Sequence, residues 1–148
     1  MKQLFLAVAL MAGVIAFAAP TPEPTEKVLK AFKETFAFAK DITWHNYSDF
    51  VQANFNQNKI QVRAQFSDDG TLIKTIRYYG ETELQPNILA KLKKKHTGKE
   101  IFGVTETMAD NDVQFIINLR DNDNWYTVRS DIYGNLETIT KFKRADNK

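Results

Sequence analysis

Residues that commonly carry out catalysis or bind metals are sparse in this sequence. It contains no cysteine and only two histidines, His45 and His96. A zinc site needs three or four ligands, and a catalytic histidine needs an oriented partner. His96 ends a lysine-rich segment that we expect to be helical, where a cation suits the helix dipole. We therefore interpret both histidines as structural and predict no catalytic residue, no metal site and no cofactor.

Acidic turns offer the remaining candidates for a metal. The stretch Asp121–Asn124 begins like the calcium loop of an EF-hand, but Trp125 stands at its fifth position and the required Gly and Glu do not follow. Asp and Asn are frequent in turns because they bond their own backbone, so we predict a turn here. The sequence also lacks a nucleophile elbow and a phosphate-binding loop. These observations favour a protein that is not an enzyme, with carboxylate chemistry left as an alternative.

Lysines gather in one segment that we expect to be helical. The basic patch consists of Lys91, Lys93, Lys94, Lys95 and Lys99. A functional interpretation is binding to an anionic surface or to nucleic acid, and the simpler one is a solvated helix face with cations near its C-terminus. The net charge of +2 is too small to indicate a polyanion partner by itself. We favour the simpler interpretation and predict no nucleic-acid partner.

Arginines follow a different pattern from lysines. In a half-buried strand, polar residues that alternate with hydrophobic ones face away from the core. Applied to the predicted strands, this rule places seven candidates on one open sheet face: Gln61, Arg63, Gln65, Arg77, Arg120, Trp125 and Arg129. Arginine presents a planar fork to carboxylates, and Arg and Trp are favoured in interfaces. We predict that these residues bind a partner; the alternative is an ordinary solvated sheet face.

The elements that position these residues follow from two hydrophobic periods. An apolar stripe at three- and four-residue spacing, beginning after Thr25 and including Phe32 and Phe36, predicts a helix. Strands are expected at 42–45, 51–56, 60–66 and 72–79, where apolar and polar residues alternate or turn residues intervene. A second helix opens at Pro86, and strands near 99–101, 113–119, 125–130 and 136–142 follow it.

The second set of elements repeats the first. Val62 and Tyr126 are 64 residues apart, and so are the turn glycines Gly70 and Gly134. The same offset holds through three strands without a gap, which indicates an internal repeat. We predict an α+β fold in which two tandem α-β-β-β-β units, residues 25–80 and 81–144, form one curved antiparallel sheet with the helices on one face.

The N-terminus has the three parts of a secretory signal. Lys2 precedes the apolar run LFLAVALMAGVIAF, and Ala16-Phe17-Ala18 offers a cleavage site. We predict a signal peptide at 1–18, a flexible leader at 19–24 and a short tail at 145–148. The apolar run is shorter than the ~20 residues of a membrane span. The mature protein is therefore expected to be exported, periplasmic or extracellular, without an integral membrane span.

Several motifs resemble one bacterial family. These are KAFKETFAFAKDITW, QFSDDGTLIKT and LQPNILAKLKKKHTGKEI, which follow the signal peptide in that order. Together they resemble the PepSY-like proteins, which are also described as beta-lactamase-inhibitor-like. The resemblance covers nearly all of the mature chain. It implies tandem α/β units on one curved sheet, export and no enzyme activity, and it identifies no inhibitory residues.

The function expected from these observations is that of a secreted or periplasmic binding module. It would inhibit or chaperone an acidic protein or peptide through the open sheet face. The alternative is a small-ligand carrier with a pocket between helix and sheet, lined by Phe32, Phe36 and Phe66.

Overall fold

The fold is that of a single antiparallel sheet with two helices. A computed structural model describes residues 23–145, so the predicted signal peptide, most of the leader and nearly all of the tail lie outside the described residues. The elements in chain order are α1 (Glu26–Thr35), β1 (Lys40–Asn46), β2 (Val51–Gln57), β3 (Ile60–Phe66), β4 (Leu72–Tyr79), a 3₁₀ turn η1 (Glu81–Glu83), α2 (Pro86–Lys95), β5 (Glu100–Ala109), β6 (Asp112–Arg120), β7 (Asn124–Asp131) and β8 (Leu136–Lys143). Among the described residues, no helix is long and apolar enough to cross a membrane.

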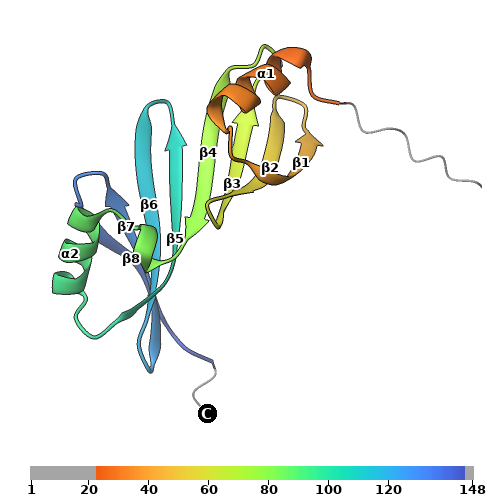
Figure 1. The fold of residues 1–148 in the computed structure, drawn as a ribbon. Helices are drawn as coiled ribbons and strands as arrows, with labels where there is room; N and C mark the ends of the chain where they lie inside the picture. Colours follow the sequence, from red (N-terminus) through yellow and green to blue (C-terminus); the bar gives the residue numbers. More distant parts are fainter. Residues whose placement is uncertain (1–22, 146–148) are drawn as a thin grey trace, which may run out of the picture.

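All eight strands form one meander. Each strand pairs antiparallel with the next one in the sequence, and β4 pairs with β5 to join the two predicted units. In Figure 1, α1 lies against the β1–β4 half and α2 against the β5–β8 half. The predicted α+β fold of two α-β-β-β-β units on one sheet is confirmed.

A single row of residues across the sheet shows that both helices cover the same face. Residues directly opposite each other in paired strands share a face. The row runs Phe55, Val62, Arg77, Glu106, Phe115, Ser130 and Leu136. Phe55 and Val62 belong to the core under α1, and Phe115 belongs to the core under α2. Two hydrophobic cores therefore share one face of the sheet, and Arg77 and Glu106 lie between them.

The two cores differ in composition. Beneath α1, rings dominate: Phe32 lies 5.0 Å from Phe55 and 5.1 Å from Trp44, measured between ring centroids. Beneath α2, the fully buried side chains are mostly aliphatic, including Ile88, Leu92 and Ile117. Each helix buries one apolar stripe, as the three- and four-residue spacing requires.

Matching contacts fix each helix to its hairpin. In the first unit, the Thr25 hydroxyl donates to the carbonyl oxygen of Asp68 at 2.9 Å. In the second, the Asn87 amide donates to the carbonyl oxygen of Ile132 at 2.9 Å. These two carbonyls occupy equivalent positions, 64 residues apart. The start of each helix is thereby tied to the last hairpin of its own unit.

Candidate functional site

The open face, which points away from both helices, carries six of the seven predicted site residues. Strand pairing places Gln61, Arg63 and Gln65 of β3 on the face opposite to Val62 and Ala64. The same pairing places Arg120 of β6 opposite Trp125 of β7, and Arg129 opposite Ile116, on that open face. The alternation of polar and apolar residues therefore assigns the correct face in β3, β6 and β7.

Arg77 does not lie on the open face, so its predicted placement is wrong. It lies opposite Val62 on one side and Glu106 on the other, on the face that carries the helices. The register of β3 and β4 shifts between Gln65 and Phe66, where the next paired residue passes from Lys74 to Leu72. A bulge adds one residue and reverses the alternation beyond it. Counting by twos from Leu72 consequently assigns Arg77 to the wrong face.

An aromatic–arginine cluster occupies the open face of the second unit. We define it as Phe102, Arg120, Trp125, Phe142 and Arg144. The Phe102 and Trp125 rings meet edge to face at 4.8 Å between centroids. The Arg120 guanidinium carbon lies 5.0 Å from the Phe102 centroid, and that of Arg144 lies 5.7 Å from Trp125. Phe102 is 58% exposed and Phe142, opposite Trp125, is 56% exposed, so the cluster presents apolar rings to solvent.

Two of the predicted arginines are paired with carboxylates of their own chain. Arg120 makes a bidentate contact with Glu100, with Nε–Oε2 and Nη2–Oε1 both at 2.7 Å. The pKa of the Glu100 carboxyl is lowered, mainly because Arg120 donates to it. Arg129 donates to Glu137 Oε2 from Nη2 at 2.5 Å. Both pairs lie on neighbouring strands at the surface, where solvent screening leaves such pairs little effect on stability.

Arg63 has a different environment. Its guanidinium carbon lies 5.2 Å from the Tyr78 centroid, and within residues 23–145 it forms no ion pair. Around it lies an amide patch, defined as Gln52, Asn54, Asn56, Gln61 and Gln65. A polar hollow of about 250 Å³ is lined by Arg63, Tyr78, Gln61, Asn54 and neighbouring residues. Arg63 is therefore available to a carboxylate from another molecule.

Hydrogen bonds order the amide patch. Gln52 Nε2 donates to Asn54 Oδ1 at 2.8 Å, and Gln65 Nε2 donates to Gln52 Oε1 at 3.0 Å. β3 and β7 are four strand spacings apart, roughly 19 Å across the sheet. The strand pairing carries Arg63 across to Asp131, so Trp125 is displaced by a further six residues along β7. The sheet therefore brings Arg120 and Trp125 together, at 5.9 Å from guanidinium carbon to ring centroid, but it separates both from Arg63. The predicted site residues therefore form two separate areas on the open face, one around Arg63 and one around Trp125.

The residues considered for catalysis or metal binding have structural contacts. The backbone N–H of His96 caps α2 by donating to Leu92, and its Nε2 is buried without a hydrogen-bond partner in the described chain. Burial first, and then Lys99 and Lys95, lowers the pKa of His96. His45 lies opposite Gln52 on the open face. No group of three or more potential metal ligands occurs among residues 23–145.

The acidic stretch after β6 is a hydrogen-bonded turn. Asp121 Oδ1 accepts from the backbone N–H of Asp123 at 3.0 Å and of Asn124 at 2.8 Å, and Oδ2 accepts from the Tyr126 hydroxyl at 2.7 Å. These bonds, the one from Tyr126 above all, lower the pKa of Asp121 to about 2. The carboxylate serves the turn, as its sequence predicts.

Most lysines of the basic patch make contacts with other residues of the protein. Lys91 and Lys95 donate from Nζ to the carbonyl oxygens of Tyr133 and Leu136, each at 2.7 Å. Lys93 forms an ion pair with Glu81, and Lys99 Nζ lies 4.7 Å from the Tyr126 centroid. The Lys91 and Lys95 contacts tie α2 to the β7–β8 hairpin, and the Lys93 ion pair ties it to η1. These structural contacts agree with the simpler interpretation of the patch.

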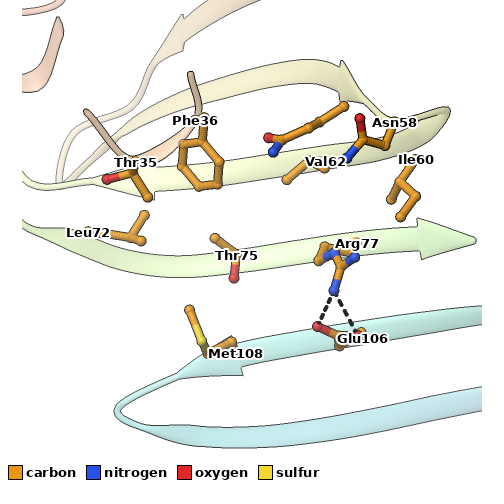
Figure 2. Close-up of a pocket in the computed structure, with 11 residues that line it drawn as sticks. Thr35, Phe36, Asn58, Ile60, Val62, Leu72, Thr75, Arg77, Glu106 and Met108 are labelled. Atoms are coloured by element: carbon orange, nitrogen blue, oxygen red, sulfur yellow. Dashed lines mark hydrogen bonds and ion pairs between the residues drawn. The ribbon is translucent and has the colours of Figure 1, made fainter. Parts of the chain in front are cut away.

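A cavity of about 300 Å³ lies on the helix-bearing face, but not where the ligand-carrier alternative expected it. Phe32 and Phe66 are 3% and 0% exposed and pack within the core, so they do not line a pocket. Only Phe36 of the three expected rings borders the cavity. Figure 2 shows Phe36 beside β3, Leu72 and Arg77 along β4, and Met108 and Glu106 along β5. We call this cavity on the helix-bearing face the seam cavity.

Sequence reasoning missed Phe102 and Arg144 of the aromatic–arginine cluster and Glu106 of the seam cavity. Phe102 falls at a register shift between Ile101 and Gly103 in the β5–β6 pairing, so strand alternation does not assign its face. Arg144 follows the last strand, and Glu106 meets Arg77 only through the pairing of β4 with β5. One signal in the sequence was available: an aromatic residue, Phe102, directly follows Ile101, which faces the core, and such a neighbour is a candidate for the open face.

Solved structures share this fold at low sequence identity. A BLIP-like protein from Bacteroides fragilis NCTC 9343 matches 86% of this chain and 92% of its own at 13% identity, with a TM-score of 0.64. A DUF2874 family protein from Bacteroides ovatus ATCC 8483 matches 84% of this chain and 91% of its own at 17% identity, with a TM-score of 0.60. A candidate periplasmic protein from Bacteroides eggerthii DSM 20697 matches 82% of this chain and 90% of its own at 15% identity, with a TM-score of 0.58.

These comparisons refine the resemblance expected from the sequence. No protein-family model matches the chain, and no curated protein matches it. The chain shares the fold of the BLIP-like protein, which agrees with the fold expected from the beta-lactamase-inhibitor-like resemblance. Nothing in the comparisons supports the PepSY-like part.

Proposed function

We propose that this protein is a non-enzymatic binding module that holds a protein partner against its open sheet face. The observation that carries the proposal is the aromatic–arginine cluster. Large rings that stay exposed on a folded surface, with arginines stacked on them, have the composition of interface anchors. The BLIP-like and periplasmic descriptions of proteins with this fold agree with a binding role in the cell envelope.

The cluster anchors the partner through its apolar rings more than through charge. Arg120 is already neutralised by Glu100, so it orients the Phe102 and Trp125 rings instead of binding a partner's carboxylate. A partner that covers Phe102 and Phe142 removes from water the roughly half of each side chain that is still exposed, which contributes about 1–1.5 kcal/mol per ring.

The amide patch supplies the polar part of the contact. Arg63 stacks on Tyr78 and has no ion pair within the described chain, so an acidic side chain of the partner meets it without displacing an existing pair. Gln61 and Gln65 flank Arg63 along β3 and offer amide donors and acceptors to the partner's backbone. The partner therefore spans the four strand spacings between the two areas, roughly 19 Å across the sheet, and their offset along the strands as well.

Affinity purification from a cell-envelope extract tests this assignment. The bait is the folded mature chain, compared with Phe102→Asp and Trp125→Ala, and with Phe38→Asp as the matched control. Phe38 is 73% exposed and lies between α1 and β1, away from the cluster. We expect the partner to be lost with Phe102→Asp and Trp125→Ala but retained with Phe38→Asp.

Equal recovery of every bound protein by all three variants would reject the open face as the contact surface. Thermal unfolding of each variant distinguishes lost binding from lost folding. Arg63→Gln, tested in the same way, is expected to weaken recovery about tenfold and to reduce its salt dependence, since it removes one charged contact.

We also propose that the protein is exported from the cytoplasm. The N-terminal sequence has the features of a signal peptide, and a chain without cysteine needs no disulfide there. N-terminal sequencing of the protein from a periplasmic fraction is expected to begin at Ala19.

A further inference from the structure

The seam cavity lies where neither helix covers the sheet. In the cross-sheet row, Val62 and Phe115 belong to the two separate cores, and the Arg77–Glu106 pair lies between them. Figure 1 shows β4 and β5 running between α1 and α2. The C-terminal end of α1, at Thr35 and Phe36, borders the cavity on one side.

The cavity has apolar and polar walls. Phe36, Leu72 and Met108 supply apolar surface, and Met108 is 39% exposed at the margin. Arg77 and the amide of Asn58 supply polar groups (Figure 2). The volume of about 300 Å³ lies at the small end of the range for small-molecule sites.

Arg77 is held firmly but is not saturated. Its Nη1 donates to Glu106 Oε1 at 2.9 Å and to Oε2 at 3.2 Å, and its guanidinium carbon lies 5.4 Å from the Tyr79 centroid. The Tyr79 hydroxyl donates to Glu106 Oε2 at 2.5 Å. A guanidinium has five N–H donors, and within residues 23–145 the hydrogen bonds of Arg77 use Nη1 alone.

Among the charged groups of the cavity, the free hydrogen-bonding capacity is therefore that of the donor Arg77. Both oxygens of Glu106 are occupied and its side chain is only 14% exposed, whereas the Arg77 side chain is 40% exposed. An amine would find no free carboxylate. A wholly apolar ligand would cover the ion pair without compensating its lost hydration.

We propose that the seam cavity binds a small amphipathic carboxylate with a medium-length alkyl chain. The carboxylate accepts from the Nε and Nη2 groups of Arg77, and the chain lies along Phe36, Leu72 and Met108. Guanidinium groups suit carboxylates because the two planar forks match. This site is on the opposite face from the aromatic–arginine cluster and is independent of the proposed partner.

Titration with sodium octanoate, followed by amide NMR shifts of the mature chain, tests the proposal. We expect saturable shifts at Leu72, Thr75 and Met108, and binding of 1-octanol and octylamine at least tenfold weaker. Met108→Trp fills the margin of the cavity and is expected to reduce octanoate affinity at least tenfold. Ile139→Trp on β8, where Ile139 is 42% exposed, is the matched control and is expected to bind normally.

Replacing Arg77 alone would leave Glu106 without its charge partner and endanger folding. The double variant Arg77→Gln, Glu106→Gln removes both charges together and is expected to bind octanoate no better than 1-octanol. Octanol binding as tight as octanoate in the wild type, or octanoate binding unaffected by Met108→Trp, would overturn the proposal. Because the partner assay uses the other face, failure here leaves that assay's outcome unchanged.

Discussion

The first unit carries amides on its open face, whereas the second carries rings and arginines at the equivalent positions. Gln61 corresponds to Trp125, Gln65 to Arg129 and Asn56 to Arg120, each 64 residues apart. The backbone positions agree, because both members of each pair lie on the open face of their own unit. Side chains on this face are solvated and contribute little to folding stability. The two units can therefore differ there without changing the fold.

The helix-bearing face shows the same contrast in its interior. The first unit fills its core with Phe32, Phe55 and Phe66, and the second with Ile88, Leu92 and Ile117. Each set buries one stripe of a ten-residue helix against the four strands of its own unit. A core accepts different residues where the total volume and the hydrophobic pattern are kept. The contacts between the helix starts and the hairpin turns are equivalent in the two units.

The largest difference between the units is expected at the turn glycines. A methyl group at Gly70 would lie 2.8 Å from the backbone oxygen of Lys27, while one at Gly134 would meet the flexible Lys91 side chain at 2.9 Å. Both glycines have positive φ, +91° and +76°. We expect Gly70→Ala to lower the free energy of unfolding by roughly 3 kcal/mol and Gly134→Ala by roughly 1 kcal/mol.

Urea denaturation of the two glycine variants measures this difference. Equal losses would mean that α1 moves away from its hairpin as easily as Lys91 changes rotamer. The contact between helix backbone and turn would then not be what distinguishes the first unit.

A smaller difference is expected at the helix starts. The Thr25 hydroxyl both accepts from the Val28 N–H at 3.3 Å and donates to Asp68, whereas α2 has no side-chain cap and Asn87 makes only the hairpin contact. Thr25→Ala should therefore cost roughly 1.5 kcal/mol and Asn87→Ala roughly 0.5 kcal/mol. The check is chemical denaturation, with Thr25→Ser as the control that keeps the hydroxyl. A loss at Asn87 equal to that at Thr25 would contradict the assigned cap.

The smallest effect concerns two turn carboxylates. The pKa of Asp69 is lowered to about 2, first by the Ser67 hydroxyl and then by the Thr71 N–H, and that of Asp121 is lowered to about 2, first by the Tyr126 hydroxyl. Because these folded-state values lie below the usual value near 4, each group stabilises the fold above pH ~4, and that contribution is lost as the pH falls toward 2.

Carboxyl NMR titration separates the two turns. Tyr126→Phe should raise the midpoint of Asp121 and leave Asp69 at about 2, while Ser67→Ala should do the reverse. If either substitution moved both midpoints, the shifts would arise from the overall charge of the protein and not from local hydrogen bonds.

The sequence by itself determined the repeat, the order of elements and the face of most strand residues. Alternation in β3, β6 and β7 and the stripe on α1 are local patterns, and their periods match strand and helix geometry directly. From them, six of the seven predicted site residues are assigned to the correct face, and the two-unit sheet follows.

Only the tertiary structure decided which residues meet. The register shift near Leu72 moves Arg77 to the helix-bearing face, and the pairing of β4 with β5 gives it Glu106 and the seam cavity. The spacing of strands separates Arg63 from Trp125 and gives Arg120 and Arg129 their carboxylates. These outcomes depend on the register and spacing between different strands, and a pattern within one strand contains no information about them.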